Sequence, residues 1–240
     1  MKIEGKNAVR ELLNSGKAVE KVLIQDSSDM SELLPIIRNK GIKFQFVSKK
    51  AMEEQSATGK HQGIIAFASD FEYVEVKDII DYARAKNEDL LVLILDGVED
   101  PHNLGSILRV CECAGAHGVI IPKHRAVGVT ETVVKVSAGA SQRVKVAKVT
   151  NINQTIDQLK KDGVFVFVAD MDGAPMYKTN LRGDIALVVG GEGQGVSALT
   201  RKNADGIISI PMYGKINSLN ASVSTGIVLY EALRQRNGLG

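Results

Sequence analysis

The chain has 240 residues, of which 44% are hydrophobic and 24% are charged, with 23 glycines and 5 prolines. This length allows one large domain or two modest ones, and the composition excludes a disordered chain, a collagen and a coiled coil. The formal net charge of +2 at pH 7 is too small to indicate a nucleic-acid-binding protein by itself. Any surface for nucleic acid has to be local.

No apolar run approaches the roughly 18 residues of a membrane span, and residues 1–6 lack the apolar core of a secretory signal. Cys111 and Cys113 lie too close together for a disulfide framework, and we interpret both as small buried residues. The histidines show no metal-ligand spacing. These observations predict a cytoplasmic protein without a metal site or a membrane segment.

The first seventy residues alternate between helical and strand patterns. Helical spacing over 5–13 and 31–40 and apolar runs over 21–25, 42–47 and 63–68 predict a small α/β domain at residues 1–72. An acidic, amphipathic stretch follows, which we interpret as a linker with a short helix at residues 73–89.

From residue 90 onward, six short β-branched runs alternate with helical segments. The runs cover 90–95, 118–121, 144–149, 164–169, 185–189 and 206–210. This alternation predicts an α/β domain over 90–240, with a parallel sheet flanked by helices. Its last helix, 221–236, carries Val223, Ile227 and Tyr230 on one side.

Open parallel sheets bind ligands beyond the carboxyl ends of their strands, so the loops at 96–109, 190–197 and 211–222 are the candidate ligand loops. The second loop matches the dinucleotide pattern G-x-G-x-x-A at 193–198. A nicotinamide-binding dehydrogenase would place an acidic residue after the next strand, whereas 208–212 has none. The dehydrogenase interpretation is therefore a weak alternative, and its test is stabilisation by NADH.

The three loops share a specific order and spacing of residues. The first carries Asp96, Val98, Asp100, Pro101, Asn103, Gly105, Ile107 and Arg109. The second carries Gly190, Glu192, Gly193, Gly195 and Ser197, and the third carries Ile210, Pro211, Met212, Ser218, Leu219, Asn220, Ser222 and Val223. Together they resemble the three motifs of the SpoU/TrmH family of S-adenosylmethionine-dependent RNA ribose 2′-O-methyltransferases.

The resemblance implies a fold and a cofactor that periodicity does not give. It implies that the parallel sheet of the second domain contains a deep trefoil knot, although knots are rare. It also implies that S-adenosylmethionine contacts Gly190, Ile210, Met212 and Leu219. Members of the family act as homodimers with the active sites near the interface, so we expect a homodimer.

Residues 5–9 and 61–64 of the first domain resemble the substrate-binding module of the ribosomal guanosine branch of this family. This favours methylation of a guanosine ribose in large-subunit (23S) ribosomal RNA. A tRNA guanosine is the alternative substrate. A non-catalytic RNA-binding or ribosome-assembly protein on the same fold is the alternative function.

Family analogy gives the catalytic work to Arg109, with Asn103, Glu192, Ser218 and Asn220 around it. A guanidinium is not deprotonated in proteins, so a cationic Arg109 that stabilises the developing alkoxide is an alternative to a general base. The asparagines and Ser218 precede or begin helices, where N-capping is the competing explanation.

RNA contacts are expected in both domains. In the first domain they are Lys60 and His61, and in the second Arg143. Lysines and arginines at 123, 125, 135, 145 and 148 are either a solvated surface or further ligands of phosphate.

Overall fold

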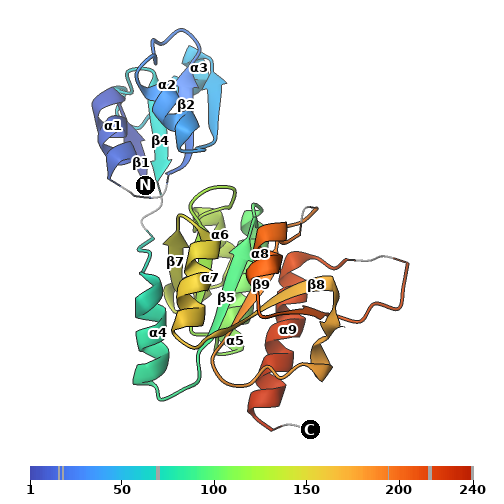
Figure 1. Cartoon of the computed structure of the whole chain (residues 1–240). Coiled ribbons are helices and arrows are strands. Elements are labelled where there is room, and N and C mark those ends of the chain that lie inside the picture. Colours follow the sequence, from blue (N-terminus) through green and yellow to red (C-terminus); the bar gives the residue numbers. More distant parts are fainter. Residues whose placement is uncertain (16, 18, 69–70, 194, 216–217, 239–240) are drawn as a thin grey trace. The chain divides into compact units, whose positions relative to one another are not determined.

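The computed structural model describes residues 1–15, 17, 19–68, 71–193, 195–215 and 218–238 (Figure 1). The chain divides into two compact units. One consists of Met1–Glu72 with Gly128–Glu131, and the other of Tyr73–Val127 with Thr132–Gly240. The structure thus assigns residues 73–89, which the sequence pattern set apart as a linker, to the second unit.

The first unit contains a four-stranded sheet of order β1-β4-β2-β3. Its elements are β1 (Lys2–Glu4), α1 (Lys6–Asn14), β2 (Val19–Gln25), α2 (Leu33–Asn39), β3 (Phe44–Val47), α3 (Lys49–Gln55) and β4 (Ile64–Ala68). The sequence pattern did not predict β1 and α3. The strand β1 has only three residues, and α3 buries only Met52, so neither has enough apolar residues to show a period.

The second unit contains a six-stranded parallel sheet of order β10-β8-β9-β5-β6-β7. Its strands are β5 (Leu91–Asp96), β6 (Gly118–Pro122), β7 (Lys145–Val149), β8 (Phe165–Pro175), β9 (Ile185–Gly190) and β10 (Gly206–Ser209). All six runs predicted from the sequence form strands. Side chains of the central strands are buried on both faces, which explains their near-continuous apolar sequences.

Helices cover both faces of this sheet (Figure 1). They are α4 (Val76–Ala85), α5 (Pro101–Cys113), α6 (Glu131–Val136), α7 (Ile152–Lys161), α8 (Ala198–Asn203) and α9 (Ala221–Arg236), with short 3-10 turns at Ala140–Gln142 and Met176–Lys178. The trefoil knot implied by the family resemblance stays a prediction.

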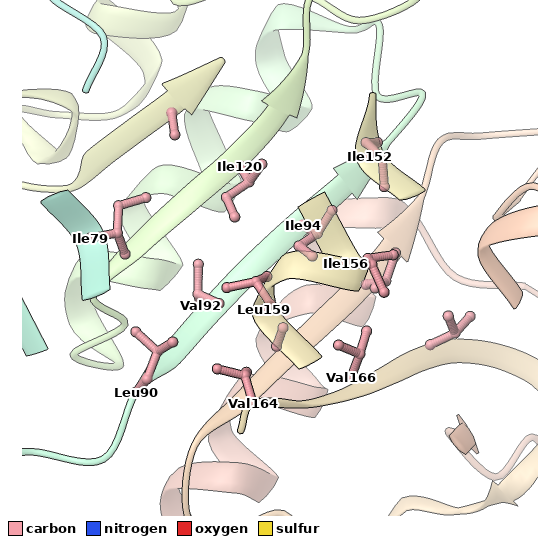
Figure 2. Packing of buried hydrophobic residues seen from close by; sticks show 14 of the residues in the cluster. Ile79, Leu90, Val92, Ile94, Ile120, Ile152, Ile156, Leu159, Val164 and Val166 are labelled. Carbon is pink, nitrogen blue, oxygen red and sulfur yellow. The ribbon is translucent and has the colours of Figure 1, made fainter. Parts of the chain in front are cut away.

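One core cluster joins α4 and α7 to the sheet (Figure 2). Ile79 of α4 and Ile156 of α7 pack against Val92, Ile120 and other strand residues, and all of them are at most 1% exposed. The stretch expected as a linker therefore contributes to the hydrophobic core of the second unit.

The last helix, α9, packs against α5 and β9 with a side that the sequence pattern did not single out. Its buried residues are Ala221, Thr225, Val228, Leu229 and Ala232. Val223 and Tyr230, which define the predicted stripe, are 48% and 50% exposed. The prediction that both cysteines are buried is wrong for Cys113, which is exposed because the α5 helix turns it away from the side that buries Cys111.

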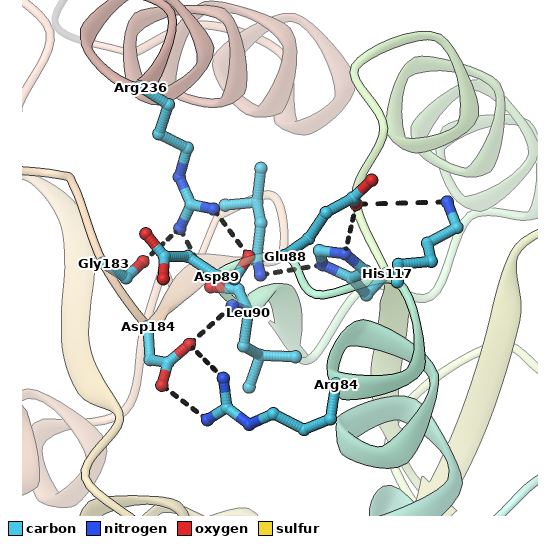
Figure 3. A network of polar contacts seen from close by, with 10 residues as sticks. Arg84, Glu88, Asp89, Leu90, His117, Gly183, Asp184 and Arg236 are labelled. Carbon is cyan, nitrogen blue, oxygen red and sulfur yellow. Dashed lines mark hydrogen bonds and ion pairs between the residues drawn. The ribbon is translucent and has the colours of Figure 1, made fainter.

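A polar network closes the amino-terminal edge of the sheet (Figure 3). Asp184 accepts hydrogen bonds from both terminal nitrogens of Arg84 and, at 2.6 Å, from the backbone N–H of Leu90. Arg236 of α9 donates to the backbone carbonyls of Asp89, Leu90 and Gly183. This network ties α4 and α9 to the edge opposite the candidate ligand loops.

Candidate functional site

The first two candidate loops meet at the carboxyl ends of β5 and β9. These strands pair in parallel, with Asp96 opposite Gly190. The backbone N–H of Gly191 donates to the carbonyl of Asp96 at 2.9 Å, and the N–H of Ser197 donates to its carboxylate at 3.0 Å. Asp96 thus holds both ends of the glycine-rich loop.

Glycine is required at this junction because main chains approach closely. A Cβ at Gly191 would lie 1.9 Å from the carbonyl oxygen of Gly97. A Cβ at Gly190 would lie 2.2 Å from the carbonyl carbon of Gly195. Since backbone atoms cannot give way as a flexible side chain can, only residues without a side chain fit here.

Three polar side chains from the three loops form one hydrogen-bonded cluster. Asn103 and Asn220 each donate from Nδ2 to Oε1 of Glu192, at 3.0 and 2.7 Å. Asn220 also donates to Oδ1 of Asn103 at 2.8 Å. The sequence predicted that these residues share a site, and the fold brings them together from positions up to 117 residues apart.

Helix starts position two members of this cluster. Asn103 lies in the first turn of α5, which Asp100 caps by accepting a hydrogen bond from the N–H of His102. Asn220 is the N-cap of α9, and its Oδ1 accepts from the N–H groups of Ser222 and Val223. Capping and cluster formation are therefore compatible, because Asn220 caps with its oxygen and reaches Glu192 with its nitrogen.

A cavity of about 760 Å³ opens beside the cluster. Seven predicted site residues line it: Gly190, Glu192, Ile210, Met212, Ser218, Leu219 and Asn220. Its wall combines apolar side chains with backbone groups of glycine-rich loops, which suits a ligand of mixed polarity.

Part of the cavity wall was missed by the sequence interpretation. Arg201 of α8 forms ion pairs with Asp170 at 3.1 Å and Asp172 at 3.3 Å, and all three line the cavity. The two acidic residues follow the run at 164–169, whose carboxyl end reaches the same edge of the sheet as the loops we selected. The rule that selected three loops would have selected this one as well.

Arg109 lies apart from the cluster within one chain. It is exposed, and it belongs to the same outward side of α5 as His102 and Cys113, which are also exposed. Asn103 lies six residues earlier and is 6% exposed, because it points to another side of the helix. Over the part of the chain that the structure describes, the side chain of Arg109 forms no hydrogen bond or ion pair.

The remaining predicted RNA contacts do not belong to this cluster. Lys60 and His61 belong to the first unit, where His61 Nδ1 accepts from the N–H of Gly63 at 3.0 Å. The preceding loop is held by Glu4, which accepts hydrogen bonds from residues 56, 57 and 58. Arg143 is exposed and pairs with Glu112 at 3.2 Å.

Hydrogen bonds from the hydroxyl of Thr58 and the N–H of Ala57 lower the pKa of Glu4 from 4.5 to about 2.

Among the described residues, no group of three or more histidine, cysteine or acidic side chains is arranged to hold a metal ion. No described helix is long and apolar enough to span a membrane.

The parallel sheet, its glycine-rich loops and the cavity at its carboxyl edge define an α/β protein with a candidate ligand site in those loops. The model of the SpoU rRNA methylase family matches residues 90–230, and the model of the RNA 2′-O ribose methyltransferase substrate-binding domain matches residues 2–74. The chain belongs to the SpoU methylase family.

Individual relatives agree with this assignment. The chain is 42% identical to YacO of Bacillus subtilis, which is assigned to the TrmH family of tRNA/rRNA methyltransferases, over 98% of this chain and 96% of YacO. It is similar in structure to the SpoU methyltransferase AviRb from Streptomyces viridochromogenes in complex with AdoMet, with a TM-score of 0.64 and 23% identity over 99% of this chain and 91% of AviRb. A TrmH/SpoU tRNA-modifying enzyme of A. aeolicus is 32% identical with a TM-score of 0.59, over 68% of this chain and 85% of that enzyme.

Proposed function

We propose that this protein transfers a methyl group from S-adenosylmethionine to a ribose 2′-hydroxyl of RNA, on a guanosine of 23S ribosomal RNA. The observation that carries the proposal is the Asn103–Glu192–Asn220 cluster beside a glycine-walled cavity, within a chain of the SpoU methylase family. The resemblance of residues 5–9 and 61–64 to the substrate-binding module of the ribosomal guanosine branch supports a ribosomal RNA substrate. Such an RNA is cytoplasmic in bacteria, and we place the protein there.

The cavity fits the cofactor by size and by chemistry. Its volume of about 760 Å³ lies within the range of small-molecule sites. Gly190, Ile210, Met212 and Leu219 would hold the cofactor, with Gly190 exposing main-chain groups where any side chain would collide. When bound, S-adenosylmethionine supplies a methyl group activated on a sulfonium.

The protein groups have to place the ribose and manage the charge that develops on its oxygen. The carboxamides of Asn103 and Asn220 fix the Glu192 carboxylate at the cavity rim, where with Ser218 it orients the incoming nucleotide. Arg109 stays cationic and stabilises the developing alkoxide, since a guanidinium keeps its proton, and the proton of the ribose hydroxyl passes to water. An Arg109→Lys variant keeps the positive charge and retains detectable methylation, whereas Arg109→Gln loses it.

Because Arg109 points outward in one chain, we propose that it acts on the site of a second copy in a homodimer. The side of α9 that carries Val223 and Tyr230 is apolar and about half exposed, and α9 packs beside α5, the helix of Arg109. A second copy that covers this surface would bury the apolar residues and shield Arg109 from water.

Mixed dimers test this arrangement. Arg109→Ala and Glu192→Gln chains, each inactive alone, are expressed together with different affinity tags and purified as the mixed species. If Arg109 acts across the interface, one of the two sites in the mixed dimer is intact and activity returns to about half of the wild-type value. No recovery would contradict the proposal, because each site would then carry one defect.

The substrate is identified by mapping ribose methylation in ribosomal RNA and tRNA from cells with and without the protein. We expect one guanosine mark in 23S ribosomal RNA to disappear. The likeness to the A. aeolicus tRNA-modifying enzyme makes tRNA the second candidate, and a lost tRNA mark would replace our assignment. Unchanged RNA, with no heat on titration with S-adenosylmethionine, would support a binding-only protein.

A further inference from the structure

Two lysines lie next to each other at the carboxyl ends of β6 and β7, outside the site described above. In the parallel β6–β7 pair, Lys148 stands opposite Ile121. Lys123 follows Ile121 by two residues, and its N–H continues the pairing by donating to the carbonyl of Val149 at 2.7 Å. Lys123 lies in the bend that directly follows β6, close enough to Lys148 for the two charges to act on each other.

The lysine pair carries two positive charges that no ion pair among the described residues offsets. Neither lysine forms an ion pair within the described part of the chain. Lys148 is half-buried, with its Nζ 5.0 Å from the centre of the Tyr73 ring. Burial and the charge of Lys123 lower the pKa of Lys148. Two cations held together without an anion repel each other, and a bound anion relieves that repulsion.

The surroundings increase the positive charge. The residues that follow Lys123 are His124 and Arg125, both exposed. Among the described residues, Arg125 also lacks an ion pair. The segment 122–130 contains no acidic residue, so no carboxylate within it offsets the charges of Lys123 and Arg125.

The lysine pair lies on the same edge of the sheet as the cavity. The loop that begins at Lys123 returns to the first candidate loop, where the N–H of Val127 donates to the carbonyl of Val98 at 2.9 Å. Strands β9, β5, β6 and β7 are consecutive neighbours. Three strand spacings of about 4.8 Å separate the carboxyl ends of β9 and β7 by about 14 Å. That is roughly four nucleotides of a stacked strand at about 3.4 Å each.

We propose that Lys123 and Lys148 bind a backbone phosphate of the RNA substrate, a few nucleotides from the methylated ribose. This inference rests on the proposed function, and it adds a positioning contact that the three motifs do not contain. The phosphate supplies the missing negative charge, and the cation–aromatic contact with Tyr73 holds Lys148 in place for it. The contact sets the register of the RNA without reading its sequence.

The test compares a Lys123→Gln/Lys148→Gln double variant with a Lys145→Gln control. Lys145 lies on the same strand but on the opposite face, where its Nζ is 5.1 Å from the ring centre of Tyr82. Binding of a fluorescein-labelled single-stranded oligoribonucleotide is measured by anisotropy over a salt series. Urea unfolding establishes that the variants are folded, and calorimetry measures their affinity for S-adenosylmethionine.

For the double variant we expect the slope of log Kd against log salt to fall by about 0.7, the value of one phosphate contact on a single strand. For two proteins that bind RNA equally at about 1 M salt, this difference in slope makes the double variant bind about fivefold more weakly than the wild type at about 0.1 M salt. The KM for RNA should rise by a similar factor, with kcat and the affinity for S-adenosylmethionine unchanged. The Lys145→Gln control should keep the wild-type slope.

Each outcome separates this inference from the proposed function. If the wild-type protein methylates RNA and the double variant keeps the wild-type salt slope, the phosphate site alone is overturned. A reduced slope where the wild-type protein transfers no methyl group would overturn the proposed function and leave the phosphate site standing. Equal losses of RNA affinity in the double variant and in the control would also overturn the site. Polyglutamate, measured in the same way, serves as a probe for an acidic protein partner. If the double variant binds RNA like the wild type but binds polyglutamate more weakly, the lysine pair binds an acidic protein instead of RNA.

Discussion

A Gly191→Ala substitution tests whether contact between the first two loops builds the cofactor cavity. The new Cβ would lie 1.9 Å from the carbonyl oxygen and 2.6 Å from the carbonyl carbon of Gly97. Ordinary van der Waals contacts of a Cβ begin at 3.4 Å. One loop therefore has to move by about 1.5 Å, and since both partners are main chain, no side-chain rotation can absorb the movement.

This displacement predicts losses in stability and in catalysis. Overpacking of this kind costs about 1 to 3 kcal/mol of unfolding free energy. A misplacement of about 1 Å can cost about 100-fold in rate, so we expect kcat/KM to fall by at least about that factor. The affinity for S-adenosylmethionine should fall as well, because Gly191 lines the cavity.

The assay combines transfer of a labelled methyl group to RNA, calorimetric titration with S-adenosylmethionine, and urea unfolding. Gly226→Ala in helix α9 is the matched control for unfolding and for cofactor binding, because its Cβ would meet only Val110 of α5 at an ordinary 3.7 Å. We expect this control to be neutral or to stabilise the protein by up to about 1 kcal/mol. A Gly191→Ala protein with wild-type cofactor affinity and activity would refute the argument that backbone contact builds the cavity.

Three further predictions follow from hydrogen bonds described above. Asn220→Ala should lower the unfolding free energy by about 1 kcal/mol through loss of the α9 cap, and it should reduce methyl transfer. Asn220→Ser keeps a capping oxygen and should restore stability but not activity. Wild-type activity in the serine variant would contradict a role for the amide nitrogen. Because the pKa of Glu4 is lowered to about 2, its stabilisation is complete above about pH 4.5 and is lost as the pH falls toward 2. The stability difference between the wild-type protein and Glu4→Gln should therefore shrink from pH 7 to pH 3 in urea unfolding, and a constant difference would exclude this linkage. Asp184→Ala should lower the unfolding free energy by about 1 to 3 kcal/mol, because the N–H of Leu90 and the guanidinium of Arg84 lose their acceptor (Figure 3). Asp81 is exposed and pairs only with Lys77 among the described residues, so Asp81→Ala should change the unfolding free energy much less. An equal effect of the two substitutions would argue against the network.

The residue pattern was enough to predict the parallel sheet and the positions of the candidate ligand loops. The runs that form β5 and β9 are apolar at nearly every position, and this pattern requires burial on both faces. Glycine, asparagine and serine directly after those runs mark places where the chain turns tightly and starts a helix. Parallel strands bring such turns to one edge, so the three loops could be selected as candidates. That Asn103, Glu192 and Asn220 share one site was implied by the family resemblance.

Packing in the folded chain sets which side of each helix is covered and which charged residues pair in the cavity. Periodicity shows that Val223 and Tyr230 lie on one side of α9, but the neighbouring α5 helix and β9 strand bury the opposite side. Arg109 and Asn103 belong to one motif in the sequence, but they lie six residues apart on helix α5 and therefore point to different sides of it. The ion pairs of Arg201 with Asp170 and Asp172 join residues from β8 and α8. Such pairings depend on distances across the folded chain, and no local pattern of residue types encodes them.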